Sequence, residues 1–314
     1  MERGSYKTFK CFHMKYYSTP GYNLNDFDLL AEGDTLYAMY VQKVPFPKGE
    51  NDSKPPNKYG LIKTIDGVTW EDMGDILLPG TEGSWDESLW AGSISKQDGK
   101  YVIYYTGVKR VERQSSCKFG KAYSIDLLNW QKDPNNPVLT FDPANPYYSD
   151  EPKLSFRDPF FFSHEGKKYL LFCAKDKSMP AGKQGCIGIV EEIQPNVFRW
   201  MPPLFSPGIY FDGLECPALY KIEGRWYLLY GCDWEDVFRY AIADSPFGPF
   251  TTYAGNQLLS KNNYVSRIVR FKNKLLLYNW YRDYPDGLVR ERLAPPKEVH
   301  ILEDSNISLS EMEE

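Results

Sequence analysis

The chain has 314 residues, of which 42% are hydrophobic, 25% are charged and 16% are aromatic, and its formal net charge is −5 at pH 7. This acidic balance, with no run of Lys or Arg, excludes the basic surface of a nucleic-acid-binding protein, and three histidines are too few for a His-rich metal site. No segment reaches the ~18 apolar residues of a membrane span, and the first residues lack the apolar region of a secretory signal. We therefore expect a cytoplasmic protein without cofactor or metal, whose partner is a small, weakly charged molecule rather than a nucleic acid or a membrane.

One pattern recurs five times along the chain: an apolar strand, a turn with Gly or Asn, and a second apolar strand that ends in aromatic residues. The copies cover residues 27–41, 93–107, 160–175, 218–232 and 267–281, with turns at Gly33, Gly99, Gly166, Gly224 and Asn273. Each copy is a hairpin signal, and the turns lie roughly 50–65 residues apart, which is the length of a propeller blade of four short strands. The pattern predicts an all-β fold, a single five-bladed β-propeller with a central pocket.

A second repeat follows the first two hairpins. Residues 64–70 (TIDGVTW) resemble residues 124–130 (SIDLLNW). An Asp at this place is typical of an Asx turn, in which its carboxylate accepts backbone N–H groups, and we expect the Trp to pack between blades. We interpret this repeat as structural and not as catalytic.

The repeats also predict the organisation of the chain. We expect residues 1–20 to form an N-terminal segment that completes the propeller. Residues 21–302 would form the five blades, and residues 303–314 (EDSNISLSEMEE) would be a frayed acidic tail.

An acidic residue stands at the start of the first strand in three of the five copies: Asp26, Asp158 and Glu215. Because the first strand of every blade lines the central axis, these carboxylates are expected to meet in one pocket. Like charges raise one another's pKa, so we expect such a cluster only where a site uses it or a cation compensates it. A pair of carboxylates is the usual apparatus for cleaving a glycosidic bond. Arg157, beside Asp158, would hold a neighbouring carboxylate ionised and donate hydrogen bonds to sugar hydroxyls.

These motifs resemble those of the five-bladed propeller glycosidases of glycoside hydrolase families 32 and 68, and of the related family 43 of arabinanases and xylosidases. Phe156-Arg157-Asp158-Pro159 matches the Arg-Asp-Pro motif of family 32, and Glu215-Cys216-Pro217 matches its Glu-Cys-Pro motif. Trp90-Ala91-Gly92-Ser93 resembles the segment of the second blade that touches the substrate. The resemblance covers about residues 20–300 and is closest to family 32.

The resemblance implies a β-fructofuranosidase-like glycosidase that retains the anomeric configuration. Asp26 would be the nucleophile, Glu215 the general acid/base, and Asp158 the stabiliser of the oxocarbenium-like transition state. The substrate-binding residues that it implies are Asn25, Trp90, Ser93, Arg157 and Cys216.

The motif around Asp26 departs from family 32. Here Phe27-Asp28 follows Asp26, where that family has Pro-Asn. This segment is closer to the Asp-Pro-Asp run of family 43. Asp28 is therefore an alternative to Asp26, since strand alternation would place both on one face, although the distance to the Gly33 turn favours Asp26. Three other functions stay open. One is an inverting α-L-arabinofuranosidase or β-xylosidase of the family 43 type, in which Asp26 would activate water. The second is a transferase that passes the sugar to another sugar with the same residues, and the third is a non-catalytic sugar-binding propeller.

Overall fold

The five predicted hairpins form the inner strand pairs of five antiparallel sheets in the computed structural model, which describes residues 16–49, 55–150, 155–210, 213–232, 235–253 and 255–312. In four of the hairpins both turn residues have positive φ, as in Asp98-Gly99 and Lys272-Asn273. This conformation matches the twist of the flanking strands and favours Gly or Asn at the second position. The pairs are β1 (Asn23–Glu32) with β2 (Thr35–Lys43), β5 (Ser88–Gln97) with β6 (Lys100–Val108), β10 (Arg157–His164) with β11 (Lys167–Lys175), β14 (Glu215–Ile222) with β15 (Arg225–Cys232), and β17 (Asn263–Phe271) with β18 (Lys274–Asp283).

Further strands extend each sheet outward. They are β3 (Lys58–Thr64) and β4 (Glu71–Leu77) in blade one, β7 (Lys118–Ser124), β8 (Gln131–Lys132) and β9 (Leu139–Thr140) in blade two, β12 (Gly185–Gln194) and β13 (Val197–Trp200) in blade three, β16 (Val237–Ala243) in blade four, and β19 (Arg290–Leu293), β20 (Lys297–Ile301) and β21 (Ile307–Glu311) in blade five. Two short 3-10 turns, η1 (Arg113–Ser116) and η3 (Pro285–Gly287), lie in the loops of blades two and five. This arrangement confirms the predicted all-β, five-bladed propeller.

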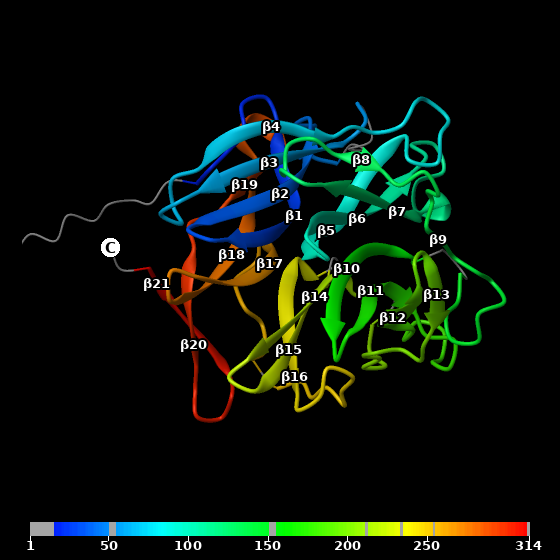
Figure 1. The fold of residues 1–314 in the computed structure, drawn as a ribbon. Coiled ribbons are helices and arrows are strands. Elements are labelled where there is room, and N and C mark those ends of the chain that lie inside the picture. The colour runs from blue at the N-terminus through cyan, green and yellow to red at the C-terminus, as the bar shows by residue number, and fades with distance from the viewer. Residues whose placement is uncertain are drawn as a thin grey trace, which may run out of the picture.

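The five sheets stand around a common centre (Figure 1). The inner strands β1, β5, β10, β14 and β17 each contact the inner strands of both neighbouring blades. Contacts between blades one and five close the ring. Asn23 Nδ2 donates to the Val289 carbonyl at 3.1 Å, and Tyr17 exchanges two backbone hydrogen bonds with Leu293. Of the expected N-terminal segment, residues 1–15 lie outside the described residues.

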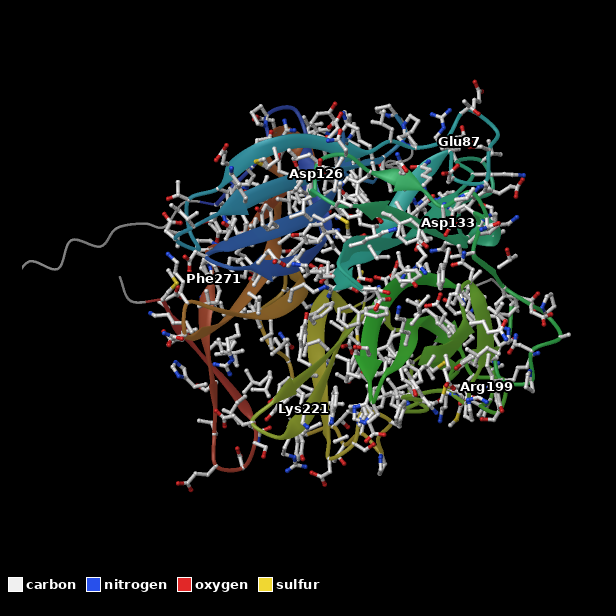
Figure 2. The ribbon with its side chains drawn as sticks, in the orientation of Figure 1. Glu87, Asp126, Asp133, Arg199, Lys221 and Phe271 are labelled. Atoms are coloured by element: carbon white, nitrogen blue, oxygen red, sulfur yellow. The ribbon has the colours of Figure 1, made fainter. Side chains whose placement is uncertain are left out.

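Buried side chains fill the spaces between neighbouring sheets (Figure 2). Three apolar clusters of described residues follow one another around the ring, and each contains buried aromatic rings. The largest fully buried side chains are Trp280, Tyr40, Tyr59, Tyr104, Tyr105, Tyr148, Tyr227, Tyr230, Tyr278, Phe27, Phe119 and Phe156. Much of the high aromatic content therefore serves packing between blades, since each ring removes a large apolar area from water.

The repeat at residues 64–70 and 124–130 forms the turns after β3 and β7. The Asp66 carboxylate accepts the N–H groups of Val68 and Thr69 at 2.8 and 2.7 Å. Asp126 accepts those of Leu128 and Asn129 at 2.9 and 2.8 Å. The structural interpretation of this repeat is confirmed.

The C-terminal residues differ from the expected frayed tail. Strand β21 pairs with β20 over five residue pairs, from Lys297 with Glu311 to Ile301 with Ile307. The sheet of blade five therefore continues to Glu311, because alternating apolar residues such as Ile307 and Leu309 pack against the core. The described residues contain no helix long and apolar enough to cross a membrane.

Candidate active site

Every inner strand carries a β-bulge at the same place near its start. The bulge residues are Asp26, Ala91, Asp158, Cys216 and Val265. Each lies seven residues before the first residue of its hairpin turn, as Asp26 lies before Gly33. A bulge adds one unpaired residue and redirects its side chain, so the five blades present equivalent residues toward the centre.

A cavity of about 220 Å³ lies at this ring of bulges. Its lining includes the residue that precedes the bulge in all five blades: Asn25, Trp90, Arg157, Glu215 and Tyr264. The bulge residues Asp26, Asp158 and Cys216 also line it. The three carboxylates predicted from the sequence therefore face one central cavity, from blades one, three and four.

Asp26 and Asp28 lie in different surroundings. Asp26 lines the cavity, whereas Asp28 is 4% exposed, accepts the Ile94 N–H at 2.9 Å and pairs with Arg267 at 3.3 Å. The expectation that strand alternation places both carboxylates on one face was wrong, because the bulge at Asp26 breaks the alternation. Asp28 acts as a buried link between blades one, two and five.

Asp158 is fixed by contacts from both neighbouring blades. Its N–H donates to Thr106 Oγ1 at 2.9 Å, and its Oδ2 accepts the Cys216 N–H at 3.0 Å. The Cys216 thiol lies 3.7 Å from the same oxygen. Cys216 therefore orients Asp158 and is itself a buried, protonated thiol, since burial raises its pKa well above the usual range.

Glu215 is held by two donors. Arg157 Nη2 donates to its Oε1 at 2.6 Å, and the Tyr264 hydroxyl donates to its Oε2 at 2.8 Å. Arg157 Nε also lies 3.7 Å from Asp158 Oδ2, so one buried guanidinium contacts two of the three carboxylates. Gly231 leaves the space for Tyr264, because a Cβ at Gly231 would stand 2.4 Å from the Tyr264 hydroxyl.

The pKa values of the aspartates are raised at the ring. Burial raises the pKa of Asp26, and the negative charges of Glu291 and Glu215 raise it further against the opposing charge of Lys43. Burial also raises the pKa of Asp158 to about 7, together with the charges of Glu215 and Asp26 and against Arg157. Such shifts are typical of sites that exchange protons near neutral pH.

Ser93 does not line the cavity, in contrast to the expectation. It is 1% exposed, and its Oγ accepts the Phe161 N–H at 3.0 Å. Ser93 lies three residues beyond Trp90 along β5, so it links blades two and three below the ring. Trp90 itself lines the cavity, and the Arg113 guanidinium lies 5.5 Å from its ring centre.

Six lining residues were not predicted from the sequence: Lys43, Arg113, Gln114, Tyr264, Trp280 and Arg282. Tyr264 could have been found, since it holds in the fifth copy the place that Glu215 holds in the fourth. The others come from second strands or from η1, which the repeat does not place at the axis. In the part of the chain that the structure describes, no three His, Cys, Asp or Glu side chains gather closely enough to hold a metal ion.

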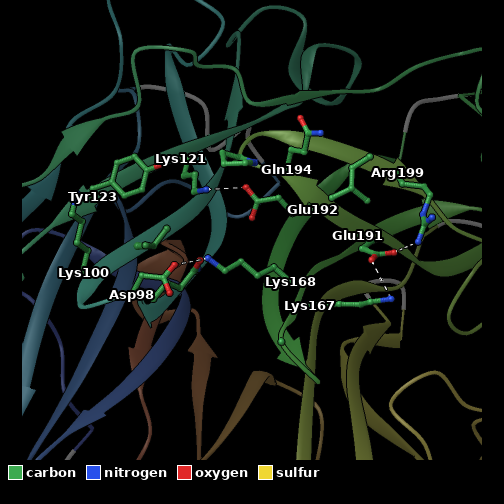
Figure 3. A pocket seen from close by; sticks show the side chains of 15 residues that line it. Asp98, Lys100, Lys121, Tyr123, Lys167, Lys168, Glu191, Glu192, Gln194 and Arg199 are labelled. Carbon is green, nitrogen blue, oxygen red and sulfur yellow. Dashed lines mark hydrogen bonds and ion pairs between the residues drawn. The ribbon is translucent and has the colours of Figure 1, made fainter.

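A larger groove of about 870 Å³ lies between blades two and three, away from the ring (Figure 3). Three of its lysines form ion pairs: Lys121 with Glu192 at 3.2 Å, Lys168 with Asp98 at 2.7 Å and Lys167 with Glu191 at 3.6 Å. None of the carboxylates predicted from the sequence, Asp26, Asp158 and Glu215, lines this groove. The central cavity is the candidate active site.

Comparison with known proteins identifies the family. The model of glycosyl hydrolases family 43 matches residues 22–270, and the chain belongs to this family. It is 29% identical over 183 residues to a β-xylosidase of Bacillus subtilis, which covers 55% of this chain and 31% of the relative. It is 27% identical over 172 residues to a β-fructofuranosidase (insoluble isoenzyme) of Arabidopsis thaliana, and this match covers 52% of this chain and 28% of the relative. The matched region thus spans about a third of each relative.

Solved structures from both predicted families share the fold. A variant of the Bombyx mori family 32 β-fructofuranosidase in complex with sucrose has a TM-score of 0.70 at 18% identity, covering 96% of this chain and 65% of that chain. A family 43 β-xylosidase/α-arabinofuranosidase from a compost metagenome in complex with xylotriose has a TM-score of 0.66 at 19% identity, covering 95% and 97%. The predicted resemblance to both families is confirmed, and at these identities the structures establish the fold alone.

Proposed function

We propose that the protein is a glycoside hydrolase that cleaves a β-fructofuranoside with retention of the anomeric configuration. One observation carries the proposal: Asp26, Asp158 and Glu215 line a single cavity from three blades, and Arg157 contacts two of them. Two carboxyl groups on either side of a glycosidic bond are sufficient for its hydrolysis. The small volume of the cavity suits one sugar unit at the ring.

In the proposed reaction, the Asp26 carboxylate attacks the anomeric carbon while Glu215 gives its proton to the departing oxygen. A glycosyl ester on Asp26 results. Water then attacks the same carbon, Glu215 takes the proton from the water, and the bond to Asp26 breaks. Asp158, oriented by the Cys216 N–H, stabilises the positive charge that develops on the sugar ring in both steps.

Tyr264 suits the changing role of Glu215. A tyrosine hydroxyl can both donate and accept a hydrogen bond. It therefore donates to the Glu215 carboxylate, as observed at 2.8 Å, and can accept a hydrogen bond from Glu215 when this residue carries the proton. The contact keeps Glu215 in place as acid and as base.

A second candidate is an inverting β-xylosidase or α-L-arabinofuranosidase. The match to the family 43 model and the β-xylosidase relative support it. In that reaction Asp26 would deprotonate water, and no ester would form. The Arg157-Asp158-Pro159 and Glu215-Cys216-Pro217 motifs support the fructofuranoside instead.

Proton NMR of the reaction distinguishes these proposals. The protein is incubated with sucrose and short fructans, and separately with nitrophenyl xylosides and arabinofuranosides. We expect fructose to appear first as its β-furanose form, before mutarotation. First release of a pentose with inverted configuration would replace the leading proposal with the second candidate. No turnover of any substrate, with sugar binding retained, would support a sugar-binding propeller.

A further inference from the structure

One wall of the cavity comes from a loop and not from an inner strand. The loop joins β6 to β7 and contains η1, from which Arg113 and Gln114 line the cavity. Hydrogen bonds within the loop fix its shape. The Arg113 N–H donates to the Lys109 carbonyl at 2.7 Å, while Ser116 Oγ accepts the Lys109 N–H at 2.9 Å and donates to the Arg113 carbonyl at 2.8 Å.

The loop is also anchored to the preceding segment. Arg110 Nε donates to Glu87 Oε1 at 2.7 Å, and the Arg110 N–H donates to Glu87 Oε2 at 3.2 Å. Glu87 is 5% exposed and the Arg110 side chain is 27% exposed, so this ion pair lies at the edge of the fold and ties the loop to it. The wall is therefore pre-organised before any ligand arrives, which limits the entropy lost on binding.

Gln114 carries an unused acceptor in this wall. Among the described residues, its Oε1 is a buried atom with no hydrogen-bond partner. A buried polar atom without a partner lowers stability, and native proteins keep few of them. Because Gln114 lines the cavity, a ligand hydroxyl that donates to Oε1 would remove this cost.

The position of the loop indicates which part of the substrate Gln114 meets. Asp26 and Asp158 lie at the starts of inner strands, so the sugar that reacts lies against the ring. The loop between β6 and β7 extends beyond the end of β6 that pairs with the start of β5, on the face where the inner strands begin. A group on the far side of the scissile bond therefore lies beside Trp90, Arg113 and Gln114.

We propose that Gln114 determines specificity for the leaving group, by accepting a hydrogen bond from one of its hydroxyl groups. This inference rests on the proposed hydrolase function. It concerns a leaving group that is itself a sugar or another polyol, since only such a group brings a hydroxyl to this wall. Trp90 and Arg113, whose guanidinium lies over the Trp90 ring, line the cavity beside Gln114.

The test compares two substrates with the same reacting sugar and different leaving groups. They are sucrose and nitrophenyl β-fructofuranoside or, if the reacting sugar is a pentose, xylobiose and nitrophenyl β-xyloside. Gln114→Met keeps the length of the side chain and removes the acceptor. We expect kcat/KM to fall about tenfold on the disaccharide and at most about twofold on the nitrophenyl glycoside, which has no leaving-group hydroxyl.

Gln131→Met is the matched control, because Gln131 is exposed on β8 of the same blade. This variant should behave as the wild type on both substrates. Equal losses on both substrates for Gln114→Met, or no loss on either, would overturn the inference while leaving the hydrolase proposal intact. If the wild-type protein cleaves none of these four substrates and none of the fructans or arabinofuranosides in the NMR experiment, the hydrolase proposal fails and the inference falls with it.

Discussion

Aspartates occupy repeated positions in two regions of the propeller, the central ring and the turns after the third strands. At the ring, burial raises the pKa of Asp26 and Asp158. At the turns the shift is opposite. Partial burial raises the pKa of Asp66, but the N–H groups of Thr69 and Val68 outweigh it and lower this pKa to about 2. The Asn129 N–H likewise lowers the pKa of Asp126.

The difference shows that one residue type serves two purposes in the same repeat architecture. In the turns, ionised carboxylates accept backbone hydrogen bonds and stabilise the fold. At the ring, the fold brings Asp26, Asp158 and Glu215 together in a buried site at a cost in stability, as expected where function requires it. Substitutions in the two regions should therefore change activity and stability in opposite patterns.

Asp26→Asn should give the largest effect. The substitution keeps the size of the side chain and removes the nucleophile, so kcat on the substrate found by NMR should fall by about 10⁴-fold or more. The melting temperature should equal or exceed that of the wild type, because burial also raises the pKa of Asp26. A variant that keeps more than about a tenth of wild-type activity would exclude Asp26 as the nucleophile or base.

Glu215→Gln should cost less, and its cost should depend on the leaving group. Loss of the general acid lowers rates by about 10²–10⁴-fold where the departing oxygen needs a proton. A fluoride leaving group needs no such proton. Steady-state and burst kinetics of Glu215→Gln on sucrose and on fructosyl fluoride would separate these two cases. If the substitution slowed formation of the ester equally with both substrates, Glu215 would not be the general acid.

Asp158→Asn should alter stability in a pH-dependent way. The folded-state pKa of Asp158, about 7, lies above its unfolded value near 3.9. The stabilisation from its protonation is thus complete below the unfolded pKa and is lost as the pH rises through 7. Because Asn never ionises, the melting temperature of the variant relative to the wild type should increase as the pH rises from 5 to 8. A difference that shrinks over this range would contradict the raised pKa.

Asp66→Ala should have the smallest effect and the opposite pattern. It removes the acceptor for two backbone N–H groups in an exposed turn, so the melting temperature should fall by about 2 °C. The value of kcat should not change. Differential scanning fluorimetry and a standard assay are sufficient, and a loss of activity without a loss of stability would disprove the structural role.

The sequence predicted the fold and much of the ring because both follow from a repeat. Asp26 and Asp158 lie seven residues before their hairpin turns and Glu215 lies eight, so the repeat places all three at one end of the axis. Counting eight residues back from the fifth turn would have added Tyr264. The bulges could not be read from the pattern, since one unpaired residue changes the face of a strand without changing its composition. For this reason the alternation of Asp26 with Asp28 and the placement of Ser93 were wrong. Gln114 lies in a loop whose path depends on hydrogen bonds from Ser116 and Arg113, which have no periodic signal.

The most direct test of the account is to trap the proposed ester. In Glu215→Ala, fructosyl fluoride can still react with the nucleophile because its leaving group needs no proton, but the ester is hydrolysed slowly without the base. Intact mass and peptide mapping should then find one fructosyl group on the peptide that contains Asp26. A fructosyl group on a carboxylate outside the central cavity, or fast turnover that releases inverted sugar without any adduct, would contradict the account.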